Sequence, residues 1–185
     1  MKKRYDEYNL LILKALQFFI ENPYEEVYLR EFAKRLNISP NTAQRFLNLF
    51  LKEGIINEHR RANLRYFKSN LESLVFKYIK KTYSVKKLTD CSLIEHLKKN
   101  NFYQVALFGS LAKGMDDKKS DIDIVCIGNN KNVDVREFEK KLKKEINLHI
   151  FTQAEWKRQA KENKAFYQDV ISTGINLIGE MPIIN

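Results

Sequence analysis

Two aspartates separated by a single residue are the strongest chemical signal in this 185-residue chain. Asp121 and Asp123 lie in the sequence Ser-Asp-Ile-Asp-Ile-Val, whose apolar residues predict a β-strand. Because side chains alternate along a strand, we expect both carboxylates on one face. Two like charges there require neutralisation, and Mg²⁺ is commonly held by one or two carboxylates together with substrate phosphates. The pair therefore predicts a site for Mg²⁺ (or Mn²⁺); the alternative is an exposed strand with a chance pair of acids.

A glycine–serine pair shortly before the aspartates predicts the other half of the site. Residues 102–108 form a short apolar run, typical of a buried strand, that ends at Gly109 and Ser110. Glycine lets backbone N–H groups approach an anion closely, and the serine hydroxyl adds a donor. A helix beginning just after this turn would add its positive end. We therefore expect an anion-binding turn, with Lys113 as a charge partner; a lone Gly-Ser pair would more often be a plain turn.

The two motifs together resemble the signature of a known superfamily. Gly109 and Ser110, ten further residues, and then Asp121 and Asp123 are similar to the motif of the DNA polymerase beta-type nucleotidyltransferases, especially the minimal nucleotidyltransferases of prokaryotes. The resemblance extends over residues 102–179. It implies that the aspartates hold metal ions on a nucleoside triphosphate and that the Gly-Ser turn holds its phosphates. It also implies a third carboxylate on a later strand, which helps to activate the attacking hydroxyl.

The position of that third carboxylate departs from the family pattern. The matching strand is residues 146–151, and the alignment places Asn147 where the family has an acid. Asparagine is neutral and cannot act as a base. His149 shares its face and could accept a proton, while Glu145 and Glu155 flank the strand and could reach in. The difference bears on catalysis more than on nucleotide or metal binding.

Composition favours an anionic partner. The formal net charge is +10 and the pI about 9.5, which makes nucleic acid the leading candidate and lysine-driven solubility the alternative. No segment is long and apolar enough to span a bilayer, and no signal-peptide pattern follows the basic start. The two cysteines lack zinc-type spacing, and Cys126 is expected to be a buried free thiol. We expect a cytoplasmic protein of prokaryotic type without a membrane partner.

The N-terminal third predicts a separate module. Helices are expected over residues 8–21, 30–36 and 40–53, with a short extended segment at 27–29 between the first two, followed by strands over 55–60 and 64–68. Ser39 is a good N-cap and Pro40 a good first helical residue. This order resembles a winged helix-turn-helix, which we assign to residues 1–70.

The resemblance implies binding to duplex DNA. The polar face of helix 40–53 would read base edges, and arginines of the hairpin would contact phosphates or the minor groove. The alternative is a winged helix that binds protein or only dimerises. The predicted DNA-binding residues are Asn41, Thr42, Gln44, Arg45, Asn48, Arg60, Arg61 and Arg65.

A helical connector is predicted over residues 71–101. Its apolar stripe could pack within the chain or on a second copy in a homodimer, and the lysines around it are expected to face outward. The stripe consists of Leu71, Leu74, Val75, Tyr78 and Ile79. The outward lysines are Lys77, Lys80, Lys81, Lys86 and Lys87.

Residues 102–185 complete an α/β (α+β) domain with a small mixed sheet. A helix is predicted over 135–144, one or two helices over 154–173 with Trp156 in the core, and a last strand over 175–178. The sequence thus predicts a DNA-binding protein whose second domain transfers a nucleoside monophosphate from an NTP to an acceptor hydroxyl, with Asp121 and Asp123 as catalytic residues. The alternative is a DNA-binding transcriptional regulator whose nucleotidyltransferase domain is catalytically silent or senses nucleotides.

Overall fold

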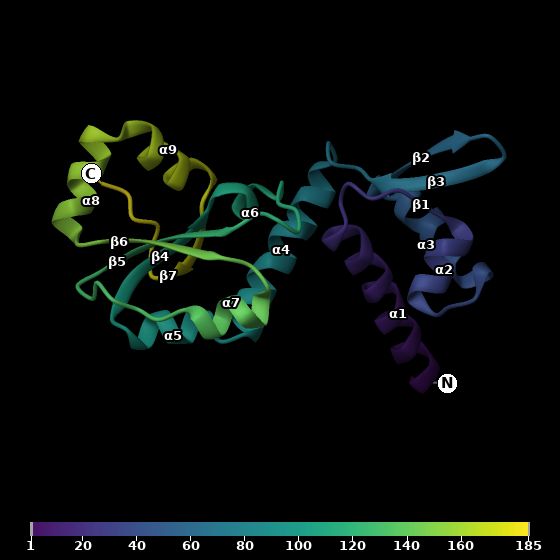
Figure 1. Ribbon diagram of the computed structural model, residues 1–185, viewed down its shortest axis with the longest axis horizontal. Coiled ribbons are helices and arrows are strands. Elements are labelled where there is room, and N and C mark those ends of the chain that lie inside the picture. Colours follow the sequence, from purple (N-terminus) through teal and green to yellow (C-terminus); the bar gives the residue numbers. More distant parts are fainter. Residues whose placement is uncertain (1, 185) are drawn as a thin grey trace. The chain divides into compact units, whose positions relative to one another are not determined.

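The computed structural model describes residues 2–184, and their side chains from Leu10 onward. The chain divides into two compact units, residues 1–77 and 78–185 (Figure 1). No helix among the described residues has the length and apolar character needed to cross a bilayer. Each unit has its own small sheet, so the mixed helix-and-strand fold predicted from the sequence is confirmed.

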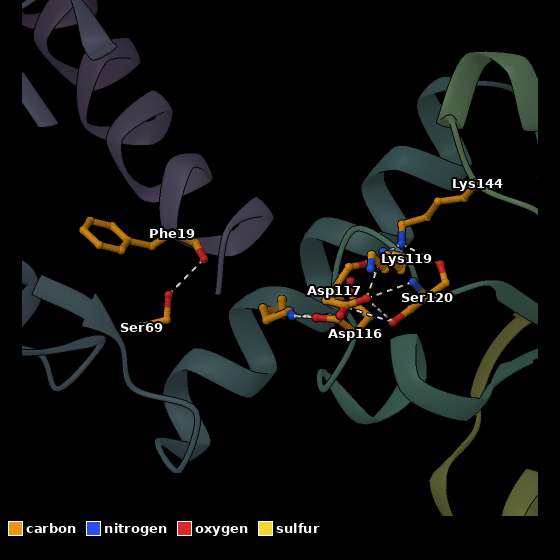
Figure 2. Close-up of polar contacts among 8 residues, drawn as sticks. Phe19, Ser69, Asp116, Asp117, Lys119, Ser120 and Lys144 are labelled. Atoms are coloured by element: carbon orange, nitrogen blue, oxygen red, sulfur yellow. Dashed lines mark hydrogen bonds and ion pairs between the residues drawn. The ribbon is translucent and has the colours of Figure 1, made fainter. Parts of the chain in front are cut away.

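The first unit is built from three helices and a three-stranded antiparallel sheet of order β1-β3-β2. Its elements are α1 (Lys2–Glu21), β1 (Val27–Tyr28), α2 (Leu29–Leu36), α3 (Pro40–Lys52), β2 (Ile56–Arg61) and β3 (Leu64–Ser69). Helix α3 begins as predicted, because the Ser39 hydroxyl accepts a hydrogen bond from the Thr42 backbone N–H at 3.1 Å. The Ser69 hydroxyl donates to the Phe19 carbonyl at 2.9 Å and ties β3 to α1 (Figure 2).

The second unit carries a four-stranded mixed sheet of order β6-β5-β4-β7. Strand β4 pairs antiparallel with β5 and β7, whereas β5 and β6 run parallel. The strands are β4 (Phe102–Phe108), β5 (Ile122–Gly128), β6 (Ile146–Phe151) and β7 (Ile175–Ile178). The helices are α5 (Leu93–Lys99), α6 (Gly109–Lys113), α7 (Arg136–Leu142), α8 (Gln153–Glu162) and α9 (Lys164–Thr173).

Helices cover both faces of this sheet (Figure 1). Alternate residues of β5 point to opposite sides: Ile124 and Cys126 pack with α5 and α7, whereas Val125 and Ile127 pack with α8 and α9. Trp156 is fully buried and its indole N–H donates to the Pro182 carbonyl at 2.6 Å, which confirms its packing role. Both cysteines are free, and burial raises the pKa of the Cys126 thiol to about 12.

Helix α4 (Leu74–Asp90) crosses from one unit into the other, and here the sequence prediction was wrong. Leu74, Val75 and Tyr78 of the predicted stripe are exposed, whereas Lys80, expected to face solvent, is 1% exposed. Periodicity alone assigned every lysine to the surface, although a lysine with a carboxylate partner can be buried. The buried line of α4 instead runs through residues four apart: Phe76, Lys80, Ser84 and Leu88.

Candidate active site

Three neighbouring strands bring the predicted site residues together at one end of the sheet. Asp123 of β5 lies opposite Phe108 of β4 and opposite Asn147 of β6. The Gly-Ser turn follows Phe108 directly, so Asp123 lies between that turn and Asn147. Because Phe108 packs with α8 and α9, the site opens on the face of the sheet that these helices cover.

The glycine of the turn lies directly against the aspartate. Gly109 has a φ of +73°, and a Cβ atom added to it would lie 2.5 Å from Oδ2 of Asp123. A side chain at this position would strain the backbone and would require the Asp123 carboxylate to move. Ser110 follows in the first turn of α6 and is half-buried. The pairing of the Gly-Ser motif with the second aspartate is thus a direct contact in the folded chain.

Asn147 contacts the same carboxylate. Its side-chain amide nitrogen donates to Oδ1 of Asp123 at 3.1 Å. The residue that the sequence analysis aligned with the third acidic position is therefore a neutral donor to Asp123. Among residues 10–184, whose side chains are described, no three His, Cys, Asp or Glu side chains gather closely enough to hold a metal ion.

Asp121 is positioned by a loop. Strand β5 begins one residue later, at Ile122, and Asp121 is exposed. Alternation along the strand therefore accounts for Asp123, whereas the placement of Asp121 depends on the segment that precedes β5. The Ile122 backbone N–H donates to the Glu145 carbonyl at 2.9 Å and fixes the point where this segment enters the sheet.

The other polar groups near β6 have structural partners. The His149 ring lies 5.2 Å from that of Phe108 and 5.5 Å from that of Phe166, between centroids. Glu155 caps α8, because its carboxylate accepts hydrogen bonds from the Thr152 backbone N–H at 2.7 Å and from the Thr152 hydroxyl at 2.9 Å. These two hydrogen bonds lower the pKa of the Glu155 carboxyl. His149 therefore packs against aromatic rings and Glu155 caps a helix, whereas Glu145, the third alternative, is exposed.

Lys113, the predicted charge partner of a phosphate, is paired with a carboxylate. Its ammonium lies 2.6 Å from Oδ1 of Asp169 in α9, and both side chains are 36% exposed. Asp169 was not found from the sequence, because a salt bridge between distant elements leaves no local pattern. The pair is accessible to solvent, so an anion of higher negative charge than a carboxylate can compete with Asp169 for Lys113.

Two lysines that the sequence analysis did not assign to the site hold the loop before Asp121. Figure 2 shows Lys144 with its ammonium directed at the turn formed by Asp117 and Ser120. Lys80 of α4 contacts the neighbouring Asp116. Such contacts join segments about thirty residues apart, and nothing in the local sequence marks them.

An open groove of about 620 Å³ lies away from these residues. Its β6 side chains belong to the opposite face of the sheet, so it does not include Asp123 or Asn147. It is lined by Lys131, Asn132, Val133, Asp134, Val135, Arg136, Ile146, Leu148 and Ile150.

The predicted DNA-binding residues of α3 lie on its solvent side. Asn41, Arg45 and Asn48 are exposed, and Thr42 and Gln44 are half-buried. The Gln44 amide donates to Oδ1 of Asn48 at 2.8 Å. These side chains form one polar helix surface.

The hairpin arginines differ in their surroundings. Arg61 lies 3.1 Å from a Glu26 carboxylate oxygen, and Arg65 contacts Glu58 across the hairpin. Arg60 is exposed and stands opposite Arg65 in the β2–β3 register. Glutamates thus compensate part of the positive charge of the hairpin.

Comparison with known proteins supports the second unit's assignment. A family model described as a nucleotidyltransferase domain matches residues 90–168. No curated protein matches the chain.

Solved structures show partial similarity. A toxin–antitoxin structure with AMP-PNP has 19% identity, a TM-score of 0.36, and covers 52% of this chain and 73% of its own. A protein from Sulfolobus solfataricus assigned as a nucleotidyltransferase has 20% identity and a TM-score of 0.30, and the match covers 44% of this chain and 78% of that protein. Reduced HlyU from Vibrio cholerae has 19% identity and a TM-score of 0.31, and the match covers 44% of this chain and 95% of that protein. The family match covers residues 90–168, somewhat less than half of the chain, and includes the Gly-Ser turn, Asp121, Asp123 and Asn147.

Proposed function

We propose that the second unit binds a nucleoside triphosphate with Mg²⁺ or Mn²⁺ and transfers the nucleoside monophosphate to an acceptor hydroxyl. The observation that carries this proposal is the contact between the Gly-Ser turn and Asp123, where a Cβ on Gly109 would lie 2.5 Å from Oδ2. That contact joins the two halves of the motif within the residues that match the family.

The donor set fits a divalent cation. Asp121 is an exposed carboxylate and Asp123 a half-buried one, and Mg²⁺ in phosphoryl-transfer sites takes one or two carboxylates and completes its shell with phosphate and water oxygens. When bound, the ion neutralises negative charge on the triphosphate and supports in-line displacement. Gly109 and Ser110 would receive the β- and γ-phosphates.

Lys113 joins the phosphates by exchanging partners. At rest its ammonium is held by Asp169 at 2.6 Å. A triphosphate carries more negative charge than one carboxylate, so it can draw Lys113 away from α9. The pair with Asp169 keeps the lysine ordered until the nucleotide arrives.

Asn147 favours a second candidate function, a nucleotide-sensing or catalytically silent effector domain. Its amide donates to Asp123 and cannot accept a proton from an attacking hydroxyl. The missing base weakens transfer more than it weakens nucleotide binding. Under this alternative the protein is a regulator whose second unit binds nucleotide.

The first unit is proposed to be a winged helix-turn-helix that binds duplex DNA. The exposed polar side of α3, the hairpin arginines and the net charge of +10 support this role. A protein that binds DNA and nucleotides would work in the cytoplasm. The alternative for the first unit is an interface for another protein or for a second copy of the chain.

The nucleotide proposal is tested by calorimetric titration of the full chain with each NTP in the presence of Mg²⁺. The double variant Asp121→Asn, Asp123→Asn should weaken Mg²⁺-dependent binding by about 100-fold or more, about 2.7 kcal/mol. A matched control is Asp90→Asn, Asp134→Asn, which removes two exposed carboxylates outside the site. Equal NTP affinity in the wild type and the site variant would contradict the proposal.

Transfer is distinguished from sensing with α-labelled NTPs, Mg²⁺ or Mn²⁺, and a cell extract as the source of acceptors. If Asn147 replaces the base, the wild type transfers label slowly or not at all, and Asn147→Asp raises the rate or the metal occupancy. A fast wild type that slows in Asn147→Asp would show that another group completes the site.

A further inference from the structure

The segment between α6 and β5 ends in Asp121 and is shaped by its own hydrogen bonds. Oδ1 of Asp117 accepts the backbone N–H groups of Lys119 and Ser120 and the Ser120 hydroxyl, each at 2.9 Å (Figure 2). The bond from the Ser120 hydroxyl is the main cause that lowers the pKa of the Asp117 carboxyl. These bonds define the turn, but they are all internal to it. Something else must fix the turn to the domain.

Lys80 attaches the start of this segment to α4. Its ammonium lies 3.1 Å from Oδ1 of Asp116 and donates to the main-chain carbonyl of the same residue. The Lys80 side chain is 1% exposed and that of Asp116 14%. Among the described residues, no hydrogen bond of good geometry reaches Oδ1 of Asp116, so the nearby ammonium is what neutralises it. A buried charge is tolerated only with such a partner, and Lys80 has the loop as its partner.

Lys144 attaches the end of the segment to the start of β6. Its ammonium donates to the Asp117 carbonyl at 2.5 Å and to the Ser120 carbonyl at 2.6 Å. Burial lowers the pKa of this lysine while Asp116 and Asp117 oppose that effect. The next residue, Glu145, accepts the Ile122 N–H. Two consecutive residues therefore hold the main chain immediately before and immediately after Asp121.

We propose that Lys80 and Lys144 are positioning residues that fix residues 115–121 and thereby place the Asp121 carboxylate for a divalent cation. The second half of this statement rests on the proposed function. Among residues 10–184, whose side chains are described, Asp121 has no hydrogen bond or ion pair of its own, so its placement comes from the anchored main chain on either side. Functional groups must be held within about 0.5 Å of their productive positions, and a loop without these anchors would not do so.

The test compares Lys144→Met with Lys143→Met in the full chain. Methionine removes every donor at similar length, and Lys143 is the exposed neighbour that carries the same charge. Two quantities are measured: hydrogen exchange of the 115–122 amides, and binding of Mn²⁺ with ATP followed by electron paramagnetic resonance. Lys144→Met should lose protection in this segment alone and bind Mn²⁺–ATP about tenfold more weakly, as expected when a supporting contact of a metal site is removed. Lys143→Met should behave as the wild type, and Lys144→Arg should recover most of the affinity, because a guanidinium can still donate to both carbonyls.

The two readouts separate the two proposals. If the wild type fails to bind Mn²⁺–ATP, the proposed function is wrong, and the exchange data alone decide whether Lys144 holds the loop. Unchanged exchange and affinity in Lys144→Met would overturn the positioning role. Loss of protection throughout β4 and β5 would also overturn it, since Lys144 would then support the whole domain.

Discussion

The two units place their charged side chains in different environments. In the first unit, arginines pair with glutamates at the surface: the side chains of Arg61 and Arg65 are 66% and 38% exposed. In the second unit, Lys80 and Lys144 reach inward to main-chain carbonyls of one loop. Exposed ion pairs contribute about 0–1 kcal/mol and are screened by salt, whereas a buried charge depends strongly on its partner. Arg61 and Arg65 therefore stay accessible to solvent, while Lys80 and Lys144 hold one loop of the second unit.

The largest expected effect is on stability, from breaking the buried pair. Lys80→Met leaves the carboxylate of Asp116 without its partner and should lower the free energy of unfolding by about 3–5 kcal/mol. Arg61→Met, which breaks an exposed pair with Glu26, should cost less than about 1 kcal/mol. Urea unfolding of both variants measures the difference.

A double variant sharpens this result. Lys80→Met with Asp116→Asn removes both charges and should recover much of the lost stability, because no unpaired charge remains buried. If Lys80→Met and Arg61→Met lowered the free energy of unfolding by similar amounts, the buried pair of Lys80 with Asp116 would contribute no more than the exposed pair of Arg61 with Glu26.

Two glycines with similar backbone angles, one in each unit, allow a second comparison. Gly54 and Gly109 have φ of +65° and +73°, but a Cβ on Gly54 would meet nothing within 4 Å. Gly54→Ala should therefore cost only the left-handed conformation, about 1–2 kcal/mol. Gly109→Ala adds the collision with Asp123, a further 1–3 kcal/mol or so, and should also weaken Mn²⁺–ATP binding. Thermal unfolding and the metal titration measure the two effects; equal losses in both variants would refute the close contact with Asp123.

Local signals in the sequence predicted the elements well. Ser39 and Pro40 fix the start of α3, and the predicted helix over 40–53 is found at Pro40–Lys52. The strand predicted over 175–178 is β7. These features depend on caps, turns and periodicity, which are properties of neighbouring residues.

Contacts between distant segments could not be predicted in the same way. Lys80 and Asp116 are 36 residues apart, and a lysine in a helix has the same pattern whether it faces water or a buried acid. The close approach of Gly109 to Asp123 was anticipated only as a motif, without the collision that a Cβ at this position would cause. The sequence thus indicated residues that the fold brings together at one end of the sheet, whereas the side chains that hold the neighbouring loop became visible only in the fold.

The smallest expected effects are on DNA binding by the hairpin. Arg60 is exposed opposite another arginine, whereas the charge of Arg61 is partly compensated by Glu26. Replacing Arg60 by alanine should lower the slope of log K against log salt by about one unit, as for one lost phosphate contact. Arg61→Ala should lower it less, and Glu26→Gln should strengthen binding by freeing Arg61. Gel-shift titrations of the full chain at several salt concentrations measure these slopes. Since phosphate contacts carry no sequence information, the three variants should affect binding to all duplexes alike. If the wild type binds no duplex even at low salt, the first unit is an interface for protein and not for DNA.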